Sequence, residues 1–175
     1  MIRALLDRRD DVEIAVSATT RPQRPGEAQG REYYFLSEQE FDRRVQQGEF
    51  LEHVVYVSGQ RYGTLNSEVD RIIRAGHSCI LELETQGARA VEDMRPDTVS
   101  VFIAAPSFAE LERRLRDRAT ESAGEIGERL ELARRQMDEA DAFDYVVLND
   151  DVERAAAELE RLVDAEIGAA GTLRS

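Results

Sequence analysis

Two arginines lie three positions apart in the segment SATTRPQRPGE, which spans residues 17–27. Pro22 and Pro25 directly follow Arg21 and Arg24, so the backbone is stiff and less conformational entropy is lost when the arginines are ordered. A guanidinium group matches the oxygen geometry of phosphate through two parallel hydrogen bonds. The spacing therefore predicts a phosphate site, although solvated arginines in a surface turn would give the same pattern in isolation.

Hydroxyl groups elsewhere in the first half of the chain could complete such a site. Ser17, Tyr33, Tyr62 and Thr64 carry hydroxyls that can donate to phosphate oxygens. A carboxylate, Glu27, closes the arginine segment. We expect these side chains to gather around the same anion.

Three further carboxylates are associated with strand-like runs. Glu52 follows one such run, and Glu82 and Glu84 alternate within CILELET. Alternation predicts that Glu82 and Glu84 share one face of a strand, near the carboxyl end where open α/β sheets bind ligands. A carboxylate there is costly unless it meets a donor or a metal. The N–H groups of a purine, or Mg²⁺, would satisfy this requirement.

The elements that must position these residues alternate between apolar runs and amphipathic helices. Serine followed three residues later by glutamate predicts helix starts at Ser37, Ser107 and Ser122. From residue 79 the order reads β-α-β-α-α-β-α, which is typical of a parallel sheet with helices on both faces. We therefore expect an α/β fold, with strands at residues 12–17, 33–36, 50–57, 79–83, 99–104 and 145–148.

Composition narrows the possible functions. The 175 residues suffice for one ordered domain, and a formal net charge of -13 argues against nucleic acid as a partner. A small anion in a local arginine pocket is compatible with that charge. No apolar run approaches the roughly 20 residues of a membrane helix, and the start MIRALLDRRDD is too charged for a signal peptide. One cysteine, Cys79, permits no internal disulfide, so we expect a cytoplasmic protein.

Five ordered segments resemble guanylate kinase: SATTRPQRPGE, GREYYF, GEFLEH, RYGT and LELETQGA. The similarity continues through PSFAELERRLRDRATES to YVVLNDD and covers essentially the whole chain. It implies a three-layer α/β fold of the P-loop kinase type, with a parallel sheet, in one domain of residues 1–175. The implied parts are a core at about residues 1–32 and 65–175, a small mixed-β GMP-binding insert at about 33–64, and a helical lid within about 108–135.

The resemblance also implies a reaction, in which ATP with Mg²⁺ phosphorylates GMP to GDP. Glu52, Thr64 and Glu82 would recognise the guanine and its surroundings, Asn149 would lie near the adenine of ATP, and Glu84 near Mg²⁺. Lid and helix arginines would stabilise the transferring phosphoryl group. The implied GMP-binding residues are Ser17, Arg21, Arg24, Glu27, Tyr33, Glu52, Tyr62, Thr64 and Glu82, and the implied catalytic residues are Arg114, Arg118 and Arg129.

Several positions depart from the pattern of that family. Glu84 stands where aspartate is usual and is one methylene longer, and Ala119 replaces a glycine. The segment VVYVSGQRYGT is one residue longer, which predicts a small bulge at residues 56–58. Arg114 lies four residues after Glu110, so an ion pair with this glutamate is the alternative to a role in phosphate binding.

The 175 residues contain no GxxxxGK[ST] segment, and all 23 basic residues are arginine. In a P-loop, backbone N–H groups cradle the donor phosphates and the lysine reaches the β- and γ-oxygens. Arginine can neutralise charge but cannot replace that backbone nest. The resemblance places Met1 just beyond the end of this segment and of the first, central strand. We expect a true start upstream of Met1, and little or no kinase activity from these 175 residues alone.

Two other functions remain open at this level. A kinase-like module without a P-loop would bind GMP or a phosphorylated peptide in the arginine pocket without catalysis. A related kinase acting on a sugar phosphate fits less well, because Glu52, Thr64 and Glu82 match residues that recognise guanine.

Overall fold

The computed structural model describes residues 1–56, 59–117 and 123–173. The chain divides into two compact units. We call Asp10–Pro96 the central unit, and Met1–Arg9 with Asp97–Ser175 the terminal unit. Each unit is described by itself.

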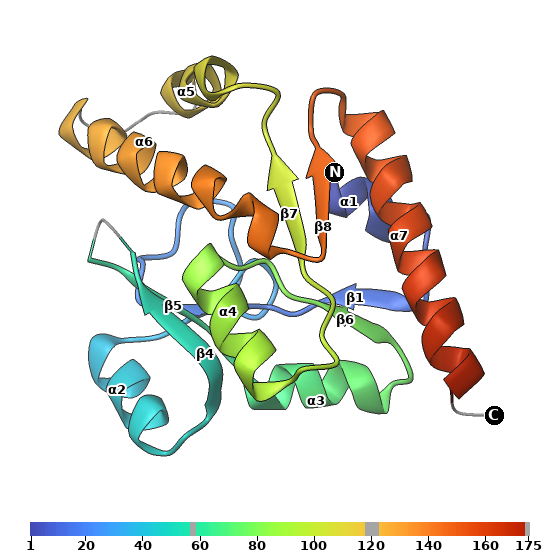
Figure 1. The fold of residues 1–175 in the computed structure, drawn as a ribbon. Coiled ribbons are helices and arrows are strands. Elements are labelled where there is room, and N and C mark those ends of the chain that lie inside the picture. The colour runs from blue at the N-terminus through green and yellow to red at the C-terminus, as the bar shows by residue number, and fades with distance from the viewer. Residues whose placement is uncertain (57–58, 118–122, 174–175) are drawn as a thin grey trace. The chain divides into compact units, whose positions relative to one another are not determined.

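A four-stranded mixed sheet forms one part of the central unit, and Figure 1 labels two of its neighbouring strands, β4 and β5. Its order is β3-β2-β5-β4, in which β2 and β3 are parallel and the other neighbours antiparallel. A separate parallel pair joins β1 to β6. The strands are β1 Val12–Ile14, β2 Ala18–Thr19, β3 Tyr34–Phe35, β4 Phe50–Val55, β5 Arg61–Leu65 and β6 Ser78–Ile80.

Three helices pack in the central unit: α2 Glu38–Gln46, α3 Asn66–Arg74 and α4 Thr85–Met94. The predicted cap at Ser37 is confirmed, because its side chain accepts a hydrogen bond from the Glu40 amide at 3.1 Å. Buried Leu51, Val69 and Val91 bring β4, α3 and α4 together in one apolar cluster. This cluster fixes α3 and α4 against β4, a strand that carries part of the candidate site.

In the terminal unit, parallel strands β7 and β8 pair along their whole length. Helix α1 packs against α7, and Arg8 bonds the Glu153 carboxylate at 2.5 Å across that contact. The predicted cap at Ser107 is confirmed by its bond from the Glu110 amide at 3.2 Å, whereas Ser122 lies outside the described residues. The elements are α1 Ile2–Leu6, β7 Val101–Ala104, α5 Phe108–Asp117, α6 Ala123–Asp138, η1 Ala140–Ala142, β8 Tyr145–Leu148 and α7 Val152–Leu173.

The parallel strands pair as β1-β6 in the central unit and as β7-β8 in the terminal unit. The mixed sheet includes β2 as well as strands from the segment predicted as an insert. The α/β character and the parallel pairing are confirmed.

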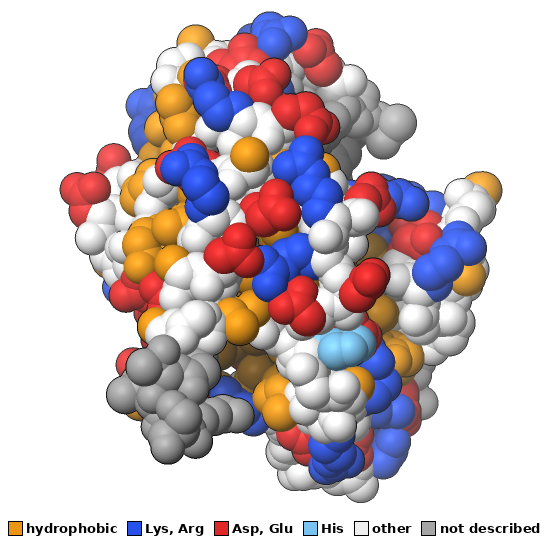
Figure 2. Space-filling view, turned by 90° about the vertical axis from the view of Figure 1, so that its right-hand side faces the viewer, with side chains coloured by type: hydrophobic (Ala, Val, Ile, Leu, Met, Phe, Trp, Pro, Cys, Tyr) orange, Lys and Arg blue, Asp and Glu red, His pale blue; other side chains and the backbone are white. Residues whose placement is uncertain are grey.

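Charged side chains of both signs cover the face shown in Figure 2, where acidic and basic groups lie interspersed. Many pair along single helices, as Arg43 does with Glu40 at 2.6 Å and Arg74 with Asp70 at 3.1 Å. No helix within the described ranges is long and apolar enough to cross a membrane.

The cap at Ser37 yields a stability prediction. Ser37→Ala removes the acceptor for the Glu40 amide and should lower the free energy of unfolding by about 1 kcal/mol. Urea titration followed by circular dichroism measures this change. The control is Ser67→Ala, at an exposed serine in α3, which should change stability by less than about 0.5 kcal/mol. Equal losses in both variants would contradict the capping role.

Candidate functional site

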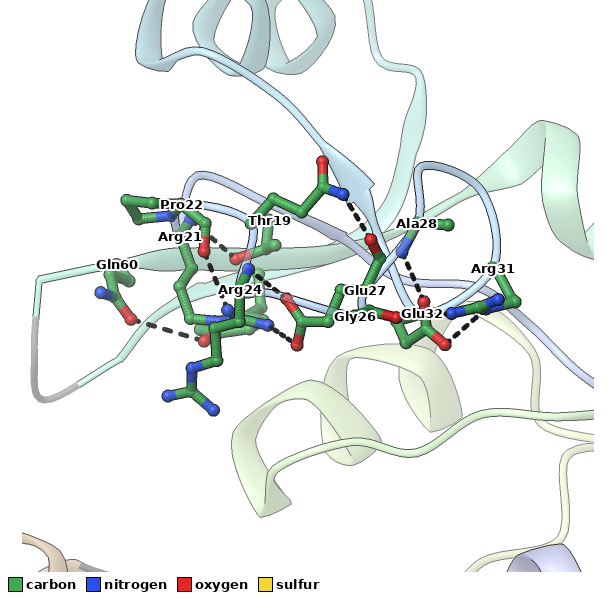
Figure 3. A network of polar contacts seen from close by, with 12 residues as sticks. Thr19, Arg21, Pro22, Arg24, Gly26, Glu27, Ala28, Arg31, Glu32 and Gln60 are labelled. Atoms are coloured by element: carbon green, nitrogen blue, oxygen red, sulfur yellow. Dashed lines mark hydrogen bonds and ion pairs between the residues drawn. The ribbon is translucent and has the colours of Figure 1, made fainter. Parts of the chain in front are cut away.

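The arginine segment forms a loop between β2 and β3, which we call the arginine loop (residues 20–33). The Arg21 side chain is only 8% exposed, and its Nη2 donates to Glu27 Oε1 at 2.7 Å (Figure 3). Its Nη1 donates to the Pro22 carbonyl at 2.9 Å. The hydrogen bond from Arg21, with one from the Arg24 amide, holds the pKa of Glu27 below its usual value. The pair is therefore charged at neutral pH.

Aromatic rings complete the surroundings of Arg21. Its guanidinium carbon lies 5.2 Å from the centre of the Tyr33 ring and 5.6 Å from that of Phe35. Tyr62 lies 5.9 Å from Tyr33, centre to centre. Cation–π attraction and the ion pair thus fix one orientation of this guanidinium.

Arg24 is placed differently from Arg21. Its backbone N–H donates to Glu27 Oε2 at 2.7 Å, while its side chain is exposed and extends away from that carboxylate (Figure 3). Within the described part of the chain, its guanidinium makes no hydrogen bond or ion pair. Gly26 supports this turn with a φ of 88°, a left-handed conformation that favours glycine. Glu27 thus binds both arginines but leaves the Arg24 guanidinium available to an anion.

A buried carboxylate lies on the same mixed sheet. Glu52 of β4 is paired in register with Thr64 of β5, and Thr64 Oγ1 donates to Glu52 Oε1 at 2.9 Å. Glu52 Oε2 would lie 2.9 Å from a Cβ at position 87, so Gly87 of α4 leaves the space that this oxygen occupies. Burial raises the pKa of Glu52 above its usual value. Because Tyr62 and Thr64 are two residues apart in β5, they share one face of the strand.

The central unit contains three further predicted site residues, Ser17, Glu82 and Glu84. Ser17 is half-buried directly before β2, and its carbonyl accepts from the Tyr34 amide at 2.9 Å. Strand β6 ends at Ile80, so Glu82 and Glu84 lie in the connection to α4 and not on a strand face as predicted. The strand ends where its pairing with β1 ends, at Ile14 opposite Ile80. Glu82 is exposed. Burial is the main cause of the raised pKa of Tyr33, and the charge of Glu82 adds to it.

The remaining predicted residues belong to the terminal unit. Arg114 Nε donates to Glu110 Oε1 at 2.8 Å, which is the predicted alternative, and its Nη1 donates to the Asn149 carbonyl at 2.9 Å. Bonds from Arg113 and Arg114 lower the pKa of Glu110 to about 2, so this pair is charged at neutral pH. Arg129 is half-buried on α6. Arg118 and part of the predicted bulge at residues 56–58 lie outside the described residues.

Comparison with known proteins bears on this arrangement. The family model described as guanylate kinase matches residues 1–166 of the chain. The chain belongs to the guanylate kinase family.

Individual guanylate kinases agree with that assignment. The guanylate kinase of Rubrobacter xylanophilus is 48% identical over 91% of this chain and 83% of its own length. That of Symbiobacterium thermophilum is 45% identical over 94% of this chain and 77% of its own. A crystal structure of guanylate kinase from Anaplasma phagocytophilum superposes with a TM-score of 0.78 at 33% identity, covering 94% of this chain and 79% of the other. The α/β guanylate kinase fold is therefore confirmed.

The sequence interpretation missed several residues of the site. Phe35 supplies the second ring over Arg21, and Thr19 Oγ1 accepts from the Arg21 amide at 3.1 Å. Gly87 clears the space beside Glu52. Of these residues, Thr19 could have been predicted from the sequence, because a hydroxyl two residues before Arg21 is a local signal for a turn. Nothing local marks Phe35 or Gly87, because their contacts come from distant segments.

The raised pKa of Glu52 predicts how stability depends on pH. The unfolded chain releases the Glu52 proton near the ordinary value of 4.5, and the folded chain only at higher pH. The folded state therefore binds more protons in this window, and stability falls as pH rises through it. Glu52→Gln should abolish this part of the fall, so its stability relative to the parent should increase from pH 5 to pH 8. Urea midpoints across this range measure the difference, and parallel curves would contradict the prediction.

Proposed function

We propose that the protein serves guanylate kinase chemistry, in which ATP phosphorylates GMP, and that the central unit binds the GMP. The supporting observation is the asymmetric pair of arginines in the arginine loop. Arg21 is fixed by Glu27 and two rings, whereas the Arg24 guanidinium is unengaged by any described residue. A phosphate that reaches the loop would gain bonds from Arg24 without first breaking an ion pair of that residue.

Guanine would be recognised at the buried carboxylate. Guanine presents N1–H and an exocyclic amino group, both donors, to which a carboxylate is the matching acceptor. Thr64 occupies Glu52 Oε1 and so fixes the orientation of the carboxylate. An adenine carries no N1–H, so it would leave the buried acceptor without a partner, and that loss is large in a dry site. Glu82 and Ser17 would add contacts around the base and phosphate.

The terminal unit would bind the donor nucleotide. Arg114, Arg118 and Arg129 would contact the phosphates of ATP, and Asn149 would lie near the adenine. Arg114 already bonds the Asn149 carbonyl at 2.9 Å, which ties the phosphate and adenine residues to one place. Arg114 would have to exchange its bond with Glu110 for a phosphate oxygen.

Magnesium would enter with the nucleotide. The described residues include no group of three or more His, Cys, Asp or Glu side chains placed to hold a metal ion. Mg²⁺ is commonly held by one or two carboxylates together with substrate phosphates, and Glu84 fits the role of the single carboxylate. When bound, Mg²⁺ neutralises the charge that develops on the phosphates.

The first test measures GMP binding by calorimetry. The chain should bind GMP with a Kd between about 1 μM and 1 mM, and more tightly than AMP. Arg24→Ala and Arg21→Ala should each weaken GMP binding about tenfold or more, because each loses charge-assisted hydrogen bonds. Arg74→Ala, at an exposed arginine of α3 that pairs with Asp70, removes one positive charge from the same unit and should leave the Kd unchanged. Equal Kd values for GMP and AMP would refute guanine recognition.

The second test measures turnover. ADP release from ATP, GMP and Mg²⁺ should be far below the ~1–100 s⁻¹ typical of kinases, because the 175 residues include neither a GxxxxGK[ST] segment nor a lysine. Turnover of ~1–100 s⁻¹ would contradict the proposal that phosphoryl transfer needs a GxxxxGK[ST] segment and its lysine. GMP binding without turnover, displaced by a phosphoserine peptide, would instead favour a binding module.

A further inference from the structure

Glu68 is a buried carboxylate that belongs to none of the groups assigned above. It lies in the first turn of α3 and is 4% exposed. Its Oε1 accepts from the Val16 amide at 3.3 Å, and its Oε2 accepts from the Tyr34 hydroxyl at 3.2 Å. Arg71 donates to both oxygens, at 3.0 Å from Nη2 and 3.2 Å from Nε. A buried charge held by four donors is costly to assemble and therefore calls for an explanation.

Glu68 contacts both ends of the arginine loop, through the Val16 amide at one end and the Tyr34 hydroxyl at the other. Val16 precedes β2, where the chain leads into the loop, and Tyr34 begins β3, where the chain leaves it. The strands are only two residues long, and the backbone bonds that flank their pairing run from Tyr34 N to Ser17 O and from Leu36 N to Thr19 O, each 2.9 Å. So short a ladder is weak, and a side chain that binds both ends adds directly to its closure.

Tyr34 also determines which way its neighbours face. Successive side chains in a strand point to opposite faces. Tyr34 points to Glu68 on one face, and Tyr33 and Phe35 on the other face lie with their rings 5.9 Å apart and both near Arg21. A tilt of β3 that released the Tyr34 hydroxyl would therefore move both rings that hold the guanidinium.

The ionised state of Glu68 suits a residue that holds both ends of the arginine loop. Burial by itself would raise the pKa of Glu68, but the bonds from Arg71, the Val16 amide and the Tyr34 hydroxyl hold the pKa below its usual value. The carboxylate is therefore ionised at neutral pH and has acceptor sites for all of its donors. Arg71 is held in turn by Glu13 of β1 at 2.9 Å.

We propose that Glu68 is a positioning residue for phosphate binding, which fastens the entry and exit of the arginine loop to α3 and so sets the orientation of Arg21. The proposal rests on the proposed function, because it assumes that this loop binds the phosphate of GMP. Glu68 need not touch the nucleotide; it acts through Val16 and Tyr34.

Glu68→Gln tests the proposal with little change in shape. An amide has no charge and one acceptor oxygen where the carboxylate has two, so it loses the ion pair with Arg71 and can accept from only one of Val16 and Tyr34. A bond donated by the amide to the Tyr34 oxygen is neutral and weaker than the charge-assisted bond that it replaces. We measure affinities for GMP and guanosine by ligand-observed NMR. GMP should bind about tenfold more weakly, while the affinity for guanosine, which lacks the phosphate, should stay within twofold. Glu13→Gln is the matched control, because Glu13 contacts Arg71 but neither end of the loop, and both affinities should remain unchanged.

Tyr34→Phe provides a second variant that removes one hydroxyl and keeps the ring. It should weaken GMP binding about threefold by itself and should add less than twofold in the Glu68→Gln background, because both changes break the same contact. If Glu68→Gln does not fold, Tyr34→Phe alone decides, and a change below 1.5-fold overturns the proposal.

The outcomes separate this proposal from the proposed function. A parent chain that binds GMP no better than guanosine overturns the phosphate site, and the role of Glu68 fails with it. A parent that prefers GMP, with Glu68→Gln losing GMP and guanosine affinity equally or not at all, overturns only the positioning role. A loss confined to GMP supports it, whatever the change in thermal stability.

Discussion

The buried ion pair between Arg21 and Glu27 is the interaction on which the arginine loop depends. An unpaired guanidinium at this depth would cost several kcal/mol in lost hydration. Glu27 removes that cost with one oxygen and binds the Arg24 amide with the other, so one carboxylate sets both the position of one arginine and the backbone of the next. The rings of Tyr33 and Phe35 then exclude alternative orientations.

Arg21 and Arg24 therefore show a division between a fixed and an available group. Arg21 is held by Glu27 and two rings, whereas the Arg24 guanidinium is exposed and makes no hydrogen bond or ion pair with a described residue. The same division recurs at the buried carboxylate, where Thr64 engages one oxygen of Glu52 and Gly87 leaves space around the other. In the arginine loop and at Glu52, the fixed contact already restricts the side chain, so less conformational entropy would be lost when a ligand binds.

Short-range signals in the sequence predicted much of the fold. The caps at Ser37 and Ser107 and the strand at residues 145–148 depend on neighbouring residues and were predicted correctly. Residues far apart in sequence decide the features that were not predicted. The alternation in CILELET is compatible with a longer strand, yet β6 ends at Ile80, where its pairing with Ile14 of β1 ends. Similarly, Tyr34 and Glu68 meet only because β3 and α3 fold together, and no local pattern marks that contact. The roles in nucleotide binding remain predictions from family resemblance.

The internal neutralisation of Arg21 has a kinetic consequence. Because Glu27 pairs with Arg21 and Glu32 pairs with Arg31, an approaching anion meets little more than the charge of Arg24 in the loop, set within a chain of net charge -13. At distances larger than the loop itself, the net negative charge of the chain repels the anion, and this repulsion weakens over a Debye length of about 8 Å at physiological ionic strength. Added salt should therefore screen this repulsion and accelerate capture, the reverse of the slowing that salt causes where electrostatic attraction guides a ligand to its site.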